Sequence, residues 1–419
     1  MPLLKSWVET ANSADSPFPL NNLPCGVFST ADSDARCGVA IGDQIVDLAA
    51  LEDAGLVSVG ETPVFDLPFW NDFMDLGADA WAELRSCLIT LLSAGSKDQT
   101  TVARHLVAMD GAQMHMPIAV SEFTDFYASR HHATNVGTMF RGADNALPPN
   151  WLHIPIGYNG RASTVVISGT DIIRPNGQTK APDADTPVFG PCKRLDFELE
   201  LGAIVGTSTP MGQMISVAEA DQMIFGYVLL NDWSARDIQA WEYQPLGPFQ
   251  AKAFATTISP WIVTRAALEP FRTYGPPRDT ALLPYLQEPG PMLYDIDLEV
   301  QIQPLEAPMP TTICATNYNQ MYYSAAQQLA HHASSGCTMN SGDLLGSGTI
   351  SGPTRETCGS LLELSWGGQE PLALNTGEVR SFIEDGDTIT LSGHAQGDGY
   401  RIGFGQCSGA VKSALPLTR

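Results

Sequence analysis

Short alternations of apolar and polar residues recur along the chain and predict a fold built mainly from β-strands. In residues 296–302, isoleucine, leucine and valine occupy every second position, which is the period of a half-buried strand. Residues 197–201 and 362–364 alternate in the same way, with glutamate between leucines. The unbroken apolar run at 224–230 predicts a further strand.

Segments with the apolar spacing of a helix are fewer than segments with the spacing of a strand. We expect one helix at about 318–333 and another after Asp232. A third helix, ended by Gly95, is predicted by apolar residues that recur at helical spacing: Trp81, Leu84, Leu88, Leu91 and Leu92.

The first third of the chain forms a unit of its own in this interpretation. Gly42 and Asp43 lie between two apolar runs, which predicts a tight hairpin. After Pro117 the sequence becomes dense in aromatic and ionisable residues. We therefore expect a domain boundary near residue 118, with a small unit at 1–118 and a β-rich domain at 119–419.

Composition and charge exclude several classes of partner. The 419 residues include 22 Lys and Arg against 46 Asp and Glu, which gives a net charge of −24. Nucleic acids and anionic membranes bind basic surfaces, so neither is an expected partner. The hydrophobic content of 44% is ample for a large core, and 38 Gly with 30 Pro predict many turns.

The ends of the sequence and its cysteines point to the cytoplasm. We find no signal peptide, no apolar run long enough to span a bilayer and no targeting address at the C-terminus. The eight cysteines include no C-x-x-C pair, so we expect reduced and mostly buried thiols. Motifs for phosphate cradling, dinucleotide binding, serine hydrolysis and zincin chemistry are also missing from the sequence.

Glu198 and Glu200 are the first candidate site residues. They lie two positions apart on a predicted strand, so both carboxylates project from one face. One interpretation is a strand whose acidic face meets solvent. The other is a pair of oxygen ligands for a hard cation such as Mg²⁺ or Ca²⁺, because two buried parallel carboxylates need a counter-charge.

The segment that follows the strand at 224–230 is a second candidate. Asp232, Arg236, Gln239 and Tyr243 have the spacing of one helical stripe. The stripe fits either an exposed, salt-bridged helix or one wall of a polar pocket. Lys252, with apolar neighbours, fits either a surface lysine or a donor that stabilises negative charge.

Residues 125–132 form a third candidate because they bring acid, phenol, guanidinium and imidazole groups together, with Arg141 close behind. Of the adjacent His131 and His132, only one can face a given ligand on a regular strand. A histidine oriented by a carboxylate activates water, and a cation polarises a carbonyl or enolate. A single histidine is more often structural, so the residues alone leave both interpretations open.

Taken together, these segments resemble the fumarylacetoacetate hydrolase family. The resemblance is carried by DFYASRHHATNVGTMFRG (125–142), PIGYNGRASTVVISGT (155–170), LDFELELG (195–202), NDWSARDIQAWEYQPLGPFQAKAFATTISPW (231–261), GDLLGSGTISGP (342–353), LLELSW (361–366) and QGDGYRIGFGQC (396–407). It implies hydrolysis of a carbon–carbon bond in 4-fumarylacetoacetate, a diketo acid of tyrosine and phenylalanine breakdown, to fumarate and acetoacetate. It also implies a homodimer in which a small N-terminal SH3-like barrel precedes a larger mixed β-roll domain.

The resemblance implies a role for each site residue. His132 would activate water and Glu363 would orient it, while Arg236, Gln239 and Lys252 would stabilise negative charge. The Mg²⁺ or Ca²⁺ site would comprise Asp125, Glu198, Glu200 and Asp232, with Lys252 and Thr256 nearby. The implied substrate contacts are Tyr127, Arg141, Tyr158, Gln239, Tyr243 and Thr349.

One position departs from the family pattern, and two alternatives stay open. His131 stands where the family pattern leads us to expect Gln, so it could tune the neighbouring imidazole. The first alternative is another metal-dependent enzyme of the superfamily, such as an acylpyruvate hydrolase or an oxaloacetate decarboxylase. The second is a non-catalytic, metal-binding relative that has kept the fold.

Overall fold

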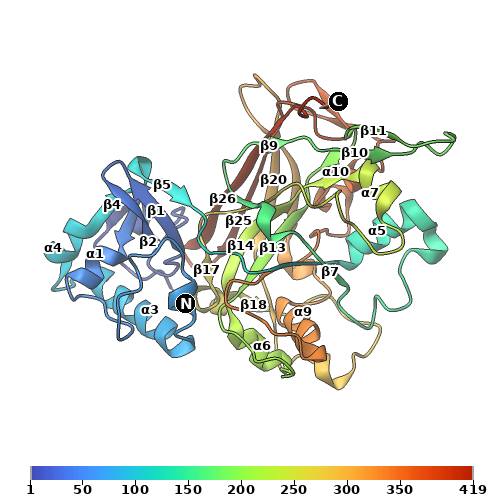
Figure 1. The fold of residues 1–419 in the computed structure, drawn as a ribbon. Helices are drawn as coiled ribbons and strands as arrows, with labels where there is room; N and C mark the ends of the chain where they lie inside the picture. The colour runs from blue at the N-terminus through green and yellow to red at the C-terminus, as the bar shows by residue number, and fades with distance from the viewer. Residues whose placement is uncertain (1, 418–419) are drawn as a thin grey trace.

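The computed structural model describes residues 2–417, and it consists of a small N-terminal unit beside a larger one (Figure 1). The small unit contains a five-stranded antiparallel sheet in the order β4-β3-β2-β1-β5. Its strands are β1 (Cys25–Thr30), β2 (Ser33–Ile41), β3 (Gln44–Asp47), β4 (Leu106–Ala108) and β5 (Gln113–His115).

Two local predictions for this unit are confirmed. The turn between β2 and β3 contains Gly42, whose φ of +58° suits glycine, and Ile41 pairs with Gln44 across the hairpin. The predicted helix is α3 (Ala78–Leu92), which turns its leucines toward the core and ends before Gly95.

The larger unit is built around two large sheets, to which four two-stranded sheets are added. The longer sheet follows the order β7-β6-β22-β13-β14-β16-β8, with β17 (Val263–Thr264) also paired to β14. Its strands are β6 (Phe123–Phe126), β7 (Gly157–Asn159), β8 (Val165–Ile167), β13 (Leu199–Val205), β14 (Ile224–Asp232), β16 (Thr256–Ile258) and β22 (Leu344–Gly346).

The second sheet follows the order β21-β20-β25-β26-β9 and contains the strand predicted from the alternation at 296–302. That strand is β20 (Asp297–Gln303), whose apolar residues are buried while the polar ones are partly exposed. The other strands are β9 (Ile172–Ile173), β21 (Thr311–Asn317), β25 (Thr388–Gln396) and β26 (Arg401–Lys412). The fold is therefore mainly β with some helix, as expected.

The central strands β13 and β14 are buried along their whole length because both faces of the long sheet are covered. Leu199 and Leu201 face the core of the larger unit. Val228 and Leu230 face a second core that they share with the N-terminal unit. The solvent-exposed interpretation of the acidic strand at 197–201 is therefore wrong. The boundary near residue 118 stays a prediction, because this shared core spans it.

Three element predictions need correction. Residues 362–364 form the short helix α10 (Leu361–Leu364) rather than a strand, because the Ser360 side chain accepts a hydrogen bond from the Glu363 N–H. The strand expected at 197–201 is interrupted: β12 (Leu195–Asp196) pairs with β15 (Ser234–Ala235), and β13 begins only at Leu199.

The helix predicted after Asp232 begins later than the residue spacing suggests. β14 continues to Asp232, and α7 spans Arg236–Glu242, so Asp232 is a strand end and not a member of the helical stripe. The helix predicted at 318–333 consists of a 3₁₀ turn at Tyr318–Gln320 followed by α9 (Ala325–His332), which starts at a Ser324 capping box.

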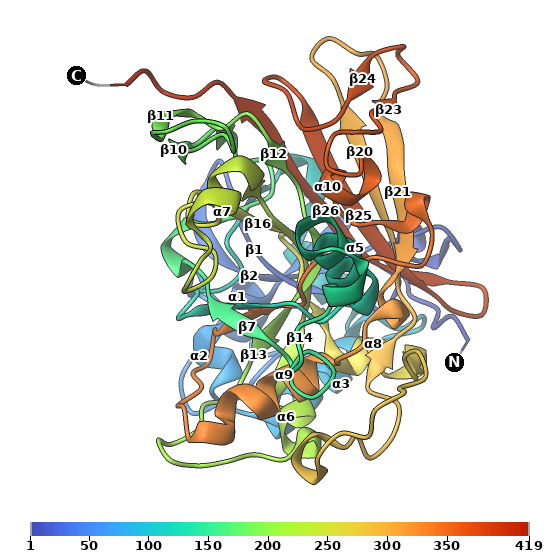
Figure 2. The same cartoon turned by 90° about the vertical axis from the view of Figure 1, so that its right-hand side faces the viewer.

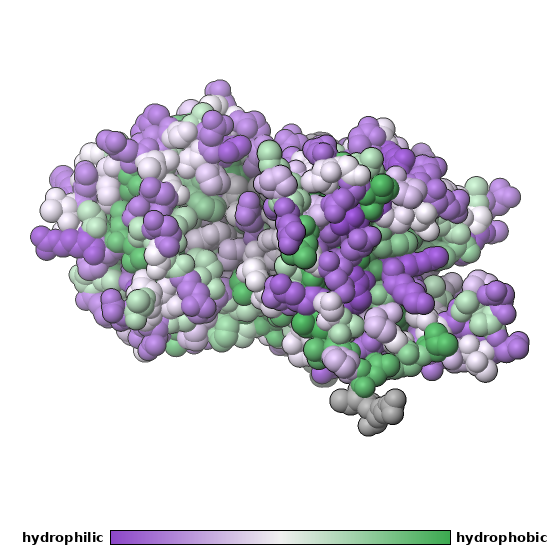
Figure 3. Space-filling model, turned by 90° about the horizontal axis from the view of Figure 1, so that it is seen from above, coloured by the Kyte–Doolittle hydropathy of each residue, from purple (hydrophilic) through white to green (hydrophobic). Residues whose placement is uncertain are grey.

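Seen from above, hydrophilic side chains are interspersed with apolar ones over the face, and the two units meet at a narrower waist (Figure 3). Across residues 2–417, we find no helix that is both long and apolar enough to cross a membrane.

The shared core predicts a measurable link between the two units. Phe225 of β14 packs against Trp81 and Trp70 of the small unit, with ring centroids 5.1 and 6.2 Å apart. We expect Phe225→Ala to lower the free energy of unfolding by about 3–5 kcal/mol, because it opens a cavity between the units. Thermal or denaturant unfolding would measure the loss.

A matched control is Phe189→Ala, since Phe189 is 62% exposed on β11 (Val188–Pro191). That variant should stay within about 0.5 kcal/mol of the unsubstituted protein. Equal losses of unfolding free energy in the two variants would show that the contact of Phe225 with the small unit does not stabilise the protein.

Candidate active site

Four carboxylates gather where the central strands of the long sheet end. Asp125 lies on β6, Glu200 on β13 and Asp232 at the end of β14, while Glu198 precedes β13. All four are buried, and each offers one oxygen atom within 4.8 Å of the others. The sheet order thus brings together carboxylates that are far apart in the sequence.

A glycine makes this close approach possible. Gly346 of β22 lies between the strands that carry Asp125 and Glu200. A Cβ atom at this position would come within 2.5 Å of Asp125 Oδ1 and 2.8 Å of Glu200 Oε2. Any larger residue would therefore displace the carboxylates.

Two cationic side chains neutralise part of this negative charge. Lys252 Nζ lies 2.7 Å from Glu198 Oε2 and 2.7 Å from Asp232 Oδ2, and Arg236 Nη1 lies 2.6 Å from Glu198 Oε1. Burial opposes ionisation of Glu198, but Arg236 and Lys252 outweigh it and hold its pKa well below the usual range. Lys252 is therefore no surface lysine, since its side chain is buried and its ammonium pairs with two carboxylates.

Asp125 and Glu200 have no such partner. Asp125 Oδ1 and Glu200 Oε1 are buried and accept no hydrogen bond. Burial and the repulsion of Asp232 raise the pKa of Asp125 to about 8, and burial with the repulsion of Asp125 raises that of Glu200. A divalent cation would supply the missing charge, and the all-oxygen donor set fits Mg²⁺ or Ca²⁺.

His132 faces the same region from α5 (Arg130–Arg141). The helix starts at Ser129, whose side chain accepts a hydrogen bond from the His132 N–H. His132 Nδ1 lies 2.6 Å from Glu363 Oε2, and both side chains are buried. Because an ionised carboxylate only accepts hydrogen bonds, Nδ1 carries the proton between them, and in the neutral imidazole Nε2 is then the nitrogen with the lone pair.

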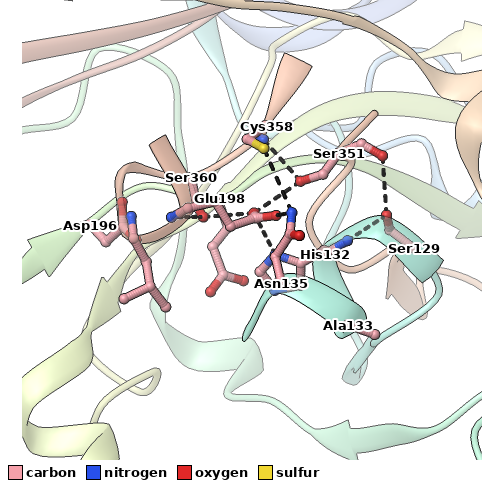
Figure 4. A network of polar contacts seen from close by, with 12 residues as sticks. Ser129, His132, Ala133, Asn135, Asp196, Glu198, Ser351, Cys358 and Ser360 are labelled. Atoms are coloured by element: carbon pink, nitrogen blue, oxygen red, sulfur yellow. Dashed lines mark hydrogen bonds and ion pairs between the residues drawn. The ribbon is translucent and has the colours of Figure 1, made fainter. Parts of the chain in front are cut away.

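Glu363 is held by a dense set of donors. Ser351 and Ser360 hydroxyls donate to its Oε2 at 2.9 and 2.8 Å, and Asn135 Nδ2 donates to Oε1 at 2.9 Å. Figure 4 shows these residues around His132, with Cys358 beside Asn135. Burial would raise the pKa of Glu363, but His132 and these donors lower it below its usual value. The carboxylate therefore stays ionised.

A cavity of about 350 Å³ joins these groups. Asp125, His132, Glu198, Arg236 and Lys252 line it, while Glu200, Asp232, Glu363 and Thr256 are not among its lining residues. All of the expected substrate contacts also line it: Tyr127, Arg141, Tyr158, Gln239, Tyr243 and Thr349. The roles of these residues stay predictions, but the structure places them around one space.

Two of the predicted residues, Thr256 and Tyr158, donate hydrogen bonds to Asp232, while His131 does not line the cavity. Thr256 donates to Asp232 Oδ1 at 2.8 Å, and Tyr158 donates to Asp232 Oδ2 at 3.1 Å. His131 is half-buried on α5 and is not among the residues that line the cavity, although it neighbours His132.

Sequence reasoning missed the residues that support this site, chiefly Asp196, Asn135, Ser351 and Ser360. One of them left a signal. Ser360 stands three residues before Glu363, the S-x-x-E pattern that starts a helix, and it would have predicted α10. We know of no comparable signal for Asp196, because its partners lie 40 and 165 residues away.

Comparisons with known proteins point to one family. The family model "Fumarylacetoacetase N-terminal" matches residues 21–117, and "Fumarylacetoacetate (FAA) hydrolase C-terminal" matches residues 122–412. The fumarylacetoacetases of Bos taurus and Homo sapiens are each 51% identical over 408 residues, covering 96% of this chain and 97% of theirs. That of Dictyostelium discoideum is 50% identical over 425 residues, covering 99% of both chains.

The fold has a solved counterpart. The fumarylacetoacetate hydrolase of Exiguobacterium antarcticum superposes with a TM-score of 0.53 at 16% identity, over 93% of this chain and 99% of its own. At that identity the likeness shows the fold alone. The two family models and the relatives at about 50% identity show more: this chain belongs to the fumarylacetoacetase family of hydrolases.

Proposed function

We propose that this protein hydrolyses the carbon–carbon bond of 4-fumarylacetoacetate to give fumarate and acetoacetate. The observation that carries the proposal is His132, joined to Glu363 at 2.6 Å, in the lining of a cavity that Asp125, Glu198 and Lys252 also line. Relatives that share about half of the sequence are named fumarylacetoacetase. Family membership and site geometry support the same reaction.

His132 is the base in this proposal. With Nδ1–H bonded to Glu363, Nε2 accepts a proton from a water molecule in the cavity. The water oxygen adds to the carbonyl carbon that joins the two halves of the substrate. The bond between the halves then breaks, the acetoacetate half leaves as a carbanion, and the fumaryl half becomes a carboxylic acid that ionises to fumarate. Glu363 stabilises the imidazolium that forms on His132.

The second half of the reaction needs stabilisation of negative charge. The bonding electrons stay on the acetoacetate carbon, which becomes an enolate and then takes up the proton that His132 removed from water, so that the imidazole returns to its neutral form. Lys252, Arg236 and Gln239 line the cavity and present the donors that can meet this charge. A Mg²⁺ or Ca²⁺ ion held by Asp125, Glu198, Glu200 and Asp232 would polarise a substrate carbonyl.

Binding of an anionic diketo acid is compatible with the net charge of −24. Arg141 lines the cavity together with Tyr127 and Tyr243, so the cavity offers a guanidinium and phenol groups to a carboxylate. Local charge governs binding in an enclosed site, while distant surface charge is screened.

The direct test is incubation with 4-fumarylacetoacetate and measurement of fumarate and acetoacetate in equal amounts. Acylpyruvate and oxaloacetate serve as alternative substrates in the same assay. Faster turnover of either one would replace the proposed substrate, and the absence of any turnover would favour a non-catalytic relative.

Removal of the cation should abolish activity. A chelator removes the cation that would balance the charge of Asp125 and Glu200, each of which has a buried oxygen that accepts no hydrogen bond. Fumarate formation should therefore stop, and added Mg²⁺ or Ca²⁺ should restore it. Zn²⁺ should restore less, because it prefers nitrogen and sulfur ligands. Full activity of the metal-free protein would exclude a role for the cation.

The two adjacent histidines should behave differently. His132→Ala should lose nearly all turnover, because it removes the base, while His131→Ala should keep most of it. Steady-state kinetics of the two variants provide the measurement, and each is the control of the other. The opposite result, an inactive His131→Ala and an active His132→Ala, would show that the assignment of the base to His132 is wrong.

Lys252→Met should lower kcat by about 10²-fold or more, since it keeps the length of the side chain but removes one charge-stabilising donor. Titration with Mg²⁺ in parallel shows whether the cation site survives, because Lys252 also contacts Glu198 and Asp232. An unchanged kcat with a raised KM would instead assign Lys252 to substrate binding.

Oligomeric state and location complete the proposal. We infer a homodimer in the cytoplasm that acts in tyrosine and phenylalanine breakdown. Light scattering after size-exclusion chromatography would test the dimer directly.

A further inference from the structure

We propose that Asp196 is a positioning residue that ties Arg236 to the helix carrying Glu363. This inference rests on the proposed function, in which Arg236 stabilises charge and Glu363 orients the base. Asp196 does not line the cavity. It acts through the two residues that it holds.

Asp196 is completely buried at the end of β12, and its carboxylate accepts four hydrogen bonds. Oδ1 accepts from the backbone N–H groups of Phe197 and Leu361 at 2.9 and 2.7 Å. Oδ2 accepts from Arg236 Nε at 2.8 Å and from the Leu362 N–H at 3.0 Å. Figure 4 shows Asp196 beside Ser360, in the same polar network as His132.

The bond to Arg236 fixes the plane of its guanidinium group. Nε is held by Asp196 and Nη1 by Glu198 at 2.6 Å, so the group is fixed at two corners. The third nitrogen, Nη2, is buried and donates no hydrogen bond. Arg236 borders the cavity, so this arrangement leaves one preorganised donor without a protein partner.

The bonds to Leu361 and Leu362 fix the start of α10. These two N–H groups belong to the first turn of the helix and have no acceptor within it. Asp196 satisfies both, while Ser360 satisfies the Glu363 N–H. Helix α10 lies beside α5, which carries His132 (Figure 2). The position of Glu363 relative to His132 therefore depends on Asp196.

One carboxylate thus connects the charge-stabilising side of the site with the water-activating side. An asparagine cannot replace it, because its NH₂ group would face two donors at whichever oxygen it replaced. We expect Asp196→Asn to lower kcat by about 10- to 100-fold while KM changes by less than about threefold, since it misplaces donors needed in the transition state.

A matched control is Asp387→Asn. Asp387 is also buried, pairs with Arg380 at 2.9 and 3.0 Å and accepts from the Glu384 N–H, but it lies outside the cavity lining. Both variants lose a buried carboxylate–arginine pair. If burial alone mattered, both would lose thermal stability and neither would lose kcat. We expect the loss of kcat only in Asp196→Asn.

Double-mutant cycles separate the two connections. In the Arg236→Gln or the Glu363→Gln background, Asp196→Asn should lower kcat by a smaller factor than in the unsubstituted protein, because one of the two residues that it positions is already gone. A full multiplicative loss in either background would contradict the connection to that residue. If the single variant Asp196→Asn has the same kcat as Asp387→Asn, the proposal is overturned.

Hydrogen exchange provides a readout that needs no substrate. The amides of Leu361 and Leu362 should exchange faster in Asp196→Asn than in Asp387→Asn, and equal rates would overturn the proposal. A wild-type protein inactive on 4-fumarylacetoacetate would contradict the proposed function alone. Should Asp196→Asn fail to fold, Asp196→Glu is subject to the same tests, because its carboxylate lies one methylene further along.

Discussion

Carboxylates that are buried together need positive charge close by, and this requirement governs the arrangement of the site. Removing an ion from water costs several kcal/mol unless a partner compensates for it. Lys252 and Arg236 compensate Glu198 and Asp232, whereas Asp125 and Glu200 keep unpaired buried oxygens. The protein therefore supplies part of the charge itself, and the remainder matches what a divalent cation provides.

The fold creates this crowding by covering the long sheet on both faces. Strands β13 and β14 are buried throughout, one face against the core of the larger unit and the other against the core shared with the N-terminal unit. The small unit thus buries one face of the strands that carry the site, although none of its residues lines the cavity. Gly346 then allows the two unpaired carboxylates to approach each other across β22.

Sequence patterns predicted the elements whose surroundings are simple. The alternation in β20, the hairpin at Gly42 and the amphipathic helix α3 depend on local periods, and all three are present. The strand predicted at residues 362–364 was wrong, because an alternation of three residues is too short to distinguish a strand from a turn of helix. Residue spacing made Glu198 and Glu200 candidates, and the family resemblance supplied the roles, whereas Asp196 depends on contacts that only the folded chain creates.

The most direct test of this account is the number of divalent cations that one chain binds. Isothermal titration of the chelator-treated protein with Mg²⁺ or Ca²⁺ measures it without any substrate. The account predicts one ion per chain, with binding greatly weakened in Glu200→Gln and unchanged in Asp387→Asn. No binding to the unsubstituted protein, or equal binding by all three proteins, would contradict the claim that Asp125 and Glu200 await a cation.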